Sequence, residues 1–346
     1  MQQPTCIKGA FHVHSRYSDG SDNMRTIIAA ARDVGLEYVV VTDHNVLKAK
    51  AQGWEGWHDG VLVIVGCEIS GKYGHCVALD IDDCRKLDKL PPPEYLQAVR
   101  DQGGTAFAAH PNGTVMREFN LHLASWDCWD DPNYAGLEIW SYMHDWIEGC
   151  SLRRLREYIK HPEQQITGPS PEVLQLWDDL AGKRRMVGLG ALDNHAANVP
   201  LRKLPWYLFK VFPHELCFRT IRTHVIMPRL SRDGPGDVAA FLEAVKNGRC
   251  YVDYAPLGDG TGFQFTALQD GVEYLIGDEL AAGRPVEFSV HSPCPAEITL
   301  VRNGKAVASA DGTELERRAD GSPGVYRVEA RINGRPWLFT NHLYVR

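Results

Sequence analysis

The sequence predicts an α/β protein in which a barrel of parallel strands and helices is followed by a small all-β domain. Apolar strand-like runs alternate with segments of helical periodicity, and a polar side chain follows the end of one strand after another. This pattern is typical of a barrel with its site at the C-terminal face. From about residue 258 the pattern changes to short strands of alternating polarity, which predicts a β-sandwich.

Length and composition set the limits of this prediction. A chain of 346 residues accommodates one large α/β unit and a small second one. A formal charge of -7 argues against a general nucleic-acid binder. The first residues lack the pattern of a signal peptide, and no apolar run approaches the ~20 residues that span a membrane. Nine cysteines without a Cys-x-x-Cys pair fit reduced thiols, so we expect a cytoplasmic protein without a membrane partner.

The first strand carries a pair of histidines, in the sequence Phe-His-Val-His-Ser-Arg-Tyr-Ser-Asp-Gly at 11–20. Side chains at i and i+2 of an extended strand point the same way, so His12 and His14 are expected to reach one point. Asp19 follows on a loop that can fold back toward them. Imidazole and carboxylate groups together are typical ligands of zinc, manganese or iron.

The next elements repeat the pattern. A helix is expected at 21–35, before a valine-rich run at 36–42 that ends in Asp43-His44-Asn45. The run at 61–65 leads to Glu68, and His75 begins the shorter run at 76–81. After a helix at 93–102, the strand at 105–109 ends in His110.

The later barrel segments are less regular. A strand at 134–140 carries Glu138, and the run at 186–192 leads into Asp193-Asn194-His195. Residues 117–180 are rich in tryptophan, with helices expected at 151–160 and 171–180. We interpret this segment as an insertion near the site, with an ordinary helical excursion of the barrel as the alternative.

The C-terminal strands are expected at 286–291, 297–302 and 324–332, and Asn303-Gly304 predicts a tight hairpin. The expected domains are therefore 1–257 and 258–346.

The polar residues at the strand ends form one candidate metal-binding set: His12, His14, Asp19, His44, Glu68, His75, His110, Asp193 and His195. They fall in six segments that share one feature, a ligand-type residue next to an apolar run, which is unlike a chance distribution. Glu68 could bridge two ions, since bridging carboxylates hold metals ~3.5–4 Å apart in two-metal hydrolases.

These motifs resemble the PHP (polymerase and histidinol phosphatase) superfamily of metal-dependent hydrolases. The matching motifs are the His-x-His at 12–14, Ser-Asp-Gly at 18–20, Thr-Asp-His-Asn at 42–45, Gly-x-Glu at 66–68, His-Pro at 110–111 and Asp-x-His at 193–195. The resemblance covers about 1–255. It implies a distorted (β/α)₇ TIM-like barrel with two or three divalent ions (manganese, iron or zinc), held by the nine residues above. Among them His75 fits the pattern least closely, and a strand-edge histidine is the alternative interpretation.

Two further patterns, Lys-Asn-Gly-Arg-Cys-Tyr-Val at 246–252 and Pro-Trp-Leu-Phe-Thr-Asn-His-Leu-Tyr-Val at 336–345, look like the CehA/McbA branch with its C-terminal immunoglobulin-like sandwich. That branch includes carbaryl hydrolase.

The predicted reaction is hydrolysis of a small-molecule substrate by a metal-bound hydroxide. We expect a phosphoesterase (EC 3.1) for a small phosphate mono- or diester. A carbamate, ester or amide hydrolase of the carbaryl type is the alternative, and a non-catalytic metal-binding interaction module is a third reading. Asp193 and His195 are candidates for proton transfer. Arg16 is a candidate for phosphate binding, or else a surface arginine.

Overall fold

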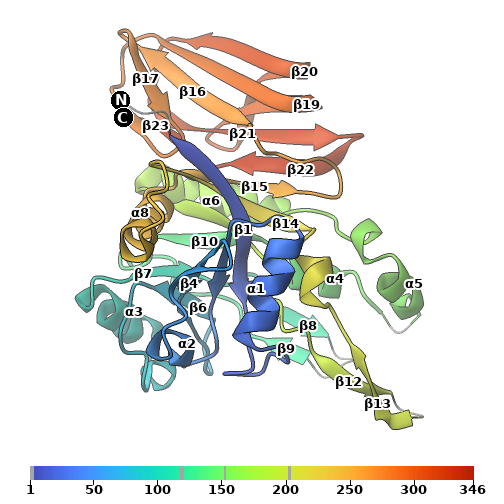
Figure 1. Cartoon of the computed structure of the whole chain (residues 1–346). Coiled ribbons are helices and arrows are strands. Elements are labelled where there is room, and N and C mark those ends of the chain that lie inside the picture. Colours follow the sequence, from blue (N-terminus) through green and yellow to red (C-terminus); the bar gives the residue numbers. More distant parts are fainter. Residues whose placement is uncertain (1–3, 117–120, 152, 202–203) are drawn as a thin grey trace.

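The computed structural model describes residues 4–116, 121–151, 153–201 and 204–346 (Figure 1). Up to residue 148 the elements are β1 (Thr5–Val13), α1 (Met24–Asp33), β2 (Tyr38–Val41), α2 (Lys48–Ala51), β3 (Gly56–His58), β4 (Val61–Val65), β5 (Cys67–Ile69), β6 (Cys76–Leu79), α3 (Pro92–Asp101), β7 (Thr105–Ala108), β8 (Thr114–Met116), β9 (Leu121–Leu123), β10 (Gly136–Ser141) and α4 (Tyr142–Glu148). Up to residue 254 they are α5 (Leu155–Lys160), α6 (Pro171–Lys183), β11 (Val187–Ala191), β12 (Asn198–Leu201), β13 (Leu204–Lys210), α7 (His214–Cys217), β14 (Ile221–Met227), α8 (Gly234–Lys246) and β15 (Cys250–Tyr254).

Two sheets of the N-terminal part come together around the first strand. One contains β1, β2 and β4 in parallel, and the other has the order β11-β10-β7-β6-β5. The segment after β11 returns to β1, because the Leu192 amide donates to the Phe11 carbonyl and the His14 amide to the Asn194 carbonyl, both at 2.9 Å. The carboxyl ends of β1, β2, β7 and β11 therefore open toward one region.

The expectation of a wholly parallel sheet is wrong at three strands of these two sheets. β3 is antiparallel to β4, β6 is antiparallel to both β5 and β7, and β14 is antiparallel to β1. The reason at β6 is the short connection from β5, since a parallel neighbour would need a crossover of about a dozen residues or more.

The valine-rich run at residues 38–41 forms β2, and all four of its residues are buried. Tyr38 and Val40 pack in one apolar cluster with β4 and α8, whereas Val39 and Val41 pack in another with α1. Alternate side chains thus face two apolar layers, so both sides of β2 must be hydrophobic.

The C-terminal part is all β and has its own apolar cluster. Its strands are β16 (Gln264–Gln269), β17 (Val272–Leu275), β18 (Glu279–Leu280), β19 (Val286–Arg302), β20 (Lys305–Ala319), β21 (Gly324–Ile332), β22 (Arg335–Thr340) and β23 (Leu343–Val345). The predicted hairpin at Asn303-Gly304 is confirmed: it joins β19 to β20, and both residues have positive φ (50° and 78°) as a tight hairpin requires.

This part is connected to the N-terminal part by a continuous sheet and by contacts between buried polar and charged side chains. β22 pairs with β15, which pairs with β14. The Asp178 carboxylate of α6 accepts two hydrogen bonds from Arg327 at 2.8 Å and lies 2.7 Å from His342 Nε2. All three residues are buried, so the contact fixes α6 against β21.

The segment 117–180 contains the β9 arm of a hairpin, β10 and three helices, and its first four residues lie outside the described part.

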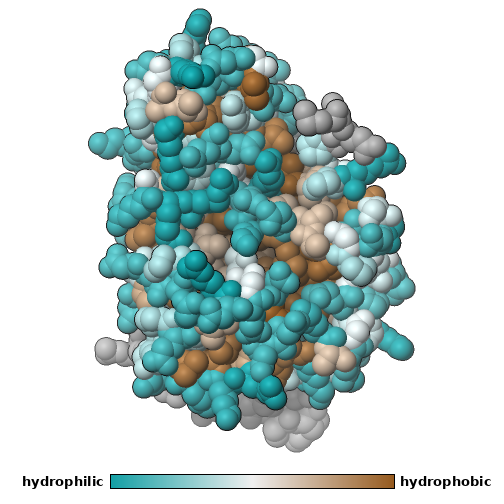
Figure 2. All heavy atoms as spheres, turned by 90° about the vertical axis from the view of Figure 1, so that its left-hand side faces the viewer, coloured by the Kyte–Doolittle hydropathy of each residue, from teal (hydrophilic) through white to brown (hydrophobic). Residues whose placement is uncertain are grey.

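On the side of the molecule where α3 and α8 lie, the surface is mostly hydrophilic with hydrophobic residues in between (Figure 2). Among the described residues, no helix is both long enough and apolar enough to cross a membrane.

Candidate metal centre

The histidines of the first strand reach the site through an irregular backbone. The register of β1 against β2 shifts between Ala10 and Val13, and His12 has a φ of 65°. The regular extended strand expected from the His-x-His spacing is therefore wrong in detail, although both imidazoles still point to one region. His110 (φ 28°) and Asp193 (φ 50°) also have left-handed backbones. Such strained residues cost about 1–3 kcal/mol each and tend to gather at functional sites.

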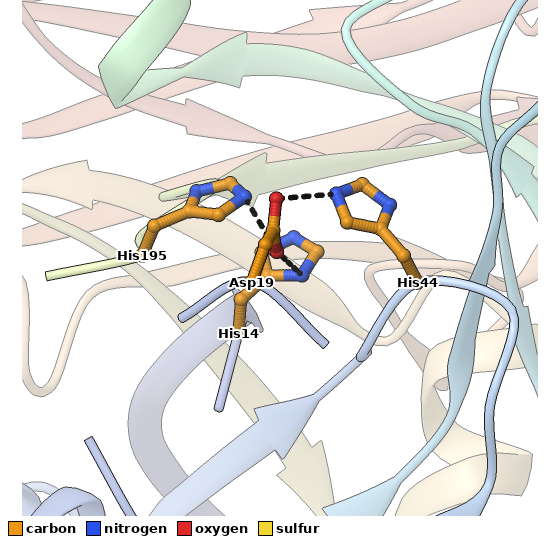
Figure 3. A group of neighbouring side chains, drawn as sticks. All are labelled: His14, Asp19, His44 and His195. Atoms are coloured by element: carbon orange, nitrogen blue, oxygen red, sulfur yellow. Dashed lines mark ion pairs between the residues drawn. The ribbon is translucent and has the colours of Figure 1, made fainter. Parts of the chain in front are cut away.

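The first group of side chains consists of His14, Asp19, His44 and His195 (Figure 3). The Asp19 oxygens lie 3.4 Å from His195 Nε2, 3.5 Å from His44 Nε2 and 3.9 Å from His14 Nδ1. Asp19 is half exposed, with 57% of its side chain accessible, and His14 is fully buried. This group therefore forms the outer edge of the site.

The second group lies deeper and centres on Glu68. Its Oε2 is 3.3 Å from His12 Nε2 and 3.3 Å from His14 Nε2. Asp193 Oδ1 approaches the same two nitrogens at 3.4 and 3.2 Å. All four side chains are at most 5% exposed.

A third group lies on the other side of Glu68. Its Oε1 is 2.8 Å from His75 Nδ1 and 3.1 Å from His110 Nε2. His144 Nε2 is 3.3 Å from Asp193 Oδ2, and its ring stacks on that of His110 at 4.1 Å. The structure thus brings all nine sequence-derived candidates together and adds His144.

Unsatisfied polar atoms show that this arrangement fits metal ions. Six buried atoms make no hydrogen bond with any described residue: His12 Nε2, His14 Nδ1 and Nε2, Glu68 Oε2, His110 Nδ1 and Asp193 Oδ1. Buried polar groups are normally hydrogen-bonded. Most of these atoms instead approach one another at 3.2–3.4 Å, as they would if they were ligands of the same cation.

The protonation states also suit metal binding. Burial and a neighbouring imidazole lower the pKa of His14 and of His144 to about 4, so each is neutral. Burial raises the pKa of Glu68, but the surrounding imidazoles outweigh this and hold it well below its usual range. Burial lowers the pKa of His44, yet the nearby carboxylates of Asp19 and Glu68 raise it to about 10. In the metal-free protein, protons therefore provide part of the positive charge that ions would bring.

Residues behind the candidate ligands hold them in place. Glu138 Oε1 lies 2.5 Å from His12 Nδ1, and its Oε2 accepts from the His110 amide at 2.8 Å. Such outer contacts orient metal-binding imidazoles. Asp43, which immediately precedes His44, accepts from Ser15 and Ser18 instead, and so fixes the loop that carries Asp19.

Sequence reasoning underestimated two of these residues. Glu138 was expected on a strand but not in the site, and His144 lies on α4 rather than at a strand end. Nothing in the spacing of His144 distinguishes it from the other helical residues. Arg16 lies in the loop between His14 and Asp19, where its side chain is exposed and makes no ion pair with a described residue.

Comparison with known proteins finds a match to a family model in the first part of the chain. Residues 10–108 match the family model of the PHP domain, which confirms the resemblance predicted from the motifs. The matched segment contains six of the nine candidate ligands, from His12 to His75. An uncharacterized protein of Methanocaldococcus jannaschii is 27% identical over 151 residues, which are 40% of this chain and 84% of that protein.

Two solved structures are similar over larger parts. A two-domain protein from Bacteroides vulgatus, containing a predicted PHP-like metal-dependent phosphoesterase, covers 98% of this chain and 96% of its own, with 16% identity and a TM-score of 0.47. A putative metal-dependent phosphoesterase from Bifidobacterium adolescentis covers 58% of this chain and 92% of its own, with 17% identity and a TM-score of 0.36.

Proposed function

We propose that the protein is a metal-dependent hydrolase that cleaves a small phosphate mono- or diester. One observation carries this proposal: buried carboxylate and imidazole atoms converge around Glu68 and Asp193 without hydrogen-bond partners among the described residues. The PHP domain over residues 10–108 agrees with it.

Bound divalent ions (manganese, iron or zinc, two or three in number) would supply a hydroxide nucleophile and polarise the phosphoryl oxygen. The ligands would be the nine candidates together with His144, and Glu68 has an oxygen facing each of two groups.

Protein side chains around this centre orient the ligands and are candidates for proton transfer and substrate binding. Glu138 orients His12 and the backbone of His110. Asp193 and His195 are candidates for proton transfer beside their ligand role. Arg16, on the exposed loop before Asp19, is a candidate for holding a substrate phosphate.

Hydrolysis of p-nitrophenyl phosphate, bis-p-nitrophenyl phosphate and an aryl carbamate tests the proposal. The protein is loaded with manganese, iron or zinc, and Asp193→Asn is the control. We expect turnover of a phosphate ester that the control lacks. Turnover of the carbamate alone would reject the phosphoesterase.

Carbamate, ester or amide hydrolysis is the second candidate. The observation that favours it is the absence of any lysine or arginine among the described residues that line the pocket beside His110 and His144, since an uncharged carbamate, ester or amide needs no such cation. The seven-unit barrel, the immunoglobulin-like sandwich, a boundary near residue 257 and membership of the CehA/McbA-like branch stay predictions of the sequence, as does a small-molecule substrate.

A further inference from the structure

A pocket adjoins the third group of the metal centre, and we infer that it binds the alcohol part of the substrate. We infer further that this alcohol is small and polar and carries no negative charge, with an ammonium group preferred. The inference rests on the proposed phosphoesterase function and specifies its substrate class. We call this pocket the side pocket; it is lined by residues 110–113, 138–141, 144–145, 148, 168–170 and 173.

The position of the side pocket suits a leaving group. It reaches the metal centre through His110, which lies 3.1 Å from Glu68, and through His144, which lies 3.3 Å from Asp193. Its other walls are the end of β10, α4 and the start of α6. A phosphoryl group at the metal centre would therefore have its ester oxygen close to the pocket entrance.

The size of the side pocket limits the alcohol. Its volume is about 60 Å³. Because one water needs roughly 10–15 Å³, this volume corresponds to only a few non-hydrogen atoms. Ethanolamine or glycerol fits this limit, whereas a naphthyl group with its ten carbons does not.

The charges around the side pocket disfavour an anionic alcohol. No lysine or arginine is among the described residues that line it. Two of its carboxylates are already used, since Glu138 lies against His12 and His110, and Asp145 accepts from Trp140 Nε1 and from backbone amides at 167–168. The third, Glu148, is exposed and has no ion-pair partner among described residues.

The start of α6 does not reverse this charge balance. Its first residue, Pro171, has no amide hydrogen, and Ser170 Oγ already accepts from the Val173 amide at 3.3 Å. Few free donors of the helix therefore remain for an anion. A second phosphate or a carboxylate in the side pocket would meet Glu148 without a compensating cation.

One buried hydroxyl is available to the alcohol. Ser141 lines the side pocket, and its Oγ is buried and makes no hydrogen bond with a described residue. Although Ser141 precedes α4, its side chain does not cap that helix. A buried hydroxyl without a partner is costly, so an alcohol or ammonium group that bonds to it would be favoured.

Three phosphate monoesters of similar size test the inference: O-phosphoethanolamine, glycerol phosphate and phosphoglycolate, with a cationic, neutral and anionic alcohol part. In the metal-loaded protein we expect kcat/KM to fall in that order, by at least about fivefold from the first to the last, as for a partly exposed charge pair. Glu148→Gln should reduce this ratio to below about twofold. Glu157→Gln, which changes an exposed glutamate of α5 outside the side pocket, should leave it unchanged.

A binding measurement separates this inference from the proposed function. In 3-aminopropylphosphonate and 3-phosphonopropionate a carbon replaces the bridging oxygen, so neither is hydrolysed, and their affinities are measured by calorimetry. Tighter binding of the amino compound without any phosphate turnover would reject the phosphoesterase but keep the side-pocket assignment. Equal affinities, or an equal ratio in Glu148→Gln and Glu157→Gln, would overturn that assignment.

Ser141→Ala should raise KM for glycerol phosphate with kcat unchanged. An unchanged KM would show that Ser141 does not bind the alcohol in the side pocket.

Discussion

Replacement of Glu68 by glutamine should abolish the stabilisation that metal ions give the protein. Glu68 is fully buried, and nitrogen atoms of five histidines lie within 2.8–3.3 Å of its two oxygens. Glutamine keeps the size of the side chain but removes the charge shared by the second and third groups. Breaking a buried charge pair costs about 3 kcal/mol or more, which lowers an ion's affinity by over 100-fold.

The size of the effect follows from the chain length. An ion present at 100 times its Kd stabilises the folded state by about 2.7 kcal/mol. With an unfolding entropy of about 2.1 cal/mol/K per residue, 346 residues give ~0.7 kcal/mol/K, so Tm should rise by about 4 °C per ion. At the same ion concentration, Glu68→Gln should show a rise of less than about 1 °C.

Differential scanning calorimetry of metal-free and metal-loaded protein measures this difference. The matched control is Glu55→Gln, because Glu55 is half buried in the same part of the chain, accepts from the Val65 amide at 3.1 Å and lies outside the metal centre. The control should keep the full rise in Tm. An equal rise in Glu68→Gln and in the wild type would refute the role of this carboxylate.

Three further predictions concern the metal ligands and the contact between the two parts. His144→Ala should lower metal affinity at least about tenfold in a chelator competition, because its neutral Nε2 faces Asp193; unchanged affinity would exclude it as a ligand. Metal binding at pH 7.5 should release protons, and His44 alone should contribute nearly one because its pKa is about 10. Calorimetry in buffers of different ionisation enthalpy measures this release, and a result of no released protons would contradict the prediction. Asp178→Asn should destabilise the fold by about 3–5 kcal/mol in urea unfolding, because buried Arg327 would lose its buried carboxylate and keep only Glu329 as a partner; a change below 1 kcal/mol would show that the pair with Asp178 is dispensable.

Acid unfolding gives a related expectation for Asp178. Burial raises its pKa, but hydrogen bonds with His342 and Arg327 outweigh this and lower it below the usual value. The stability that Asp178 gives to the folded state is therefore present above the unfolded pKa of about 3.9 and is lost as pH falls through the lower pKa of the folded state.

The strand-end pattern predicted most of the candidate site because geometry at a sheet edge is local. A polar residue directly after a buried run, such as His44 or His110, must emerge near the carboxyl end of its strand. His144 follows no such run, since it lies on a helix whose placement depends on distant packing. Its part in the site therefore could not be derived from the sequence pattern.

The direction of strands was the weak point of the fold prediction. A buried strand such as β6 has the same apolar composition whether its neighbours are parallel or antiparallel, so only the short connection at residues 70–75 carries the signal. The left-handed backbone of His12 is likewise invisible in a pattern of residue types, because it depends on the shift of register against β2.

Metal content tests the central claim most directly. The protein is stripped with a chelator, reconstituted with manganese, iron or zinc, freed of loosely bound ions and analysed by mass spectrometry together with Asp193→Asn. We predict two or three tightly bound ions per chain in the wild type and fewer in the variant. A wild-type protein that retains none of these metals would contradict the assignment of these side chains to a metal centre.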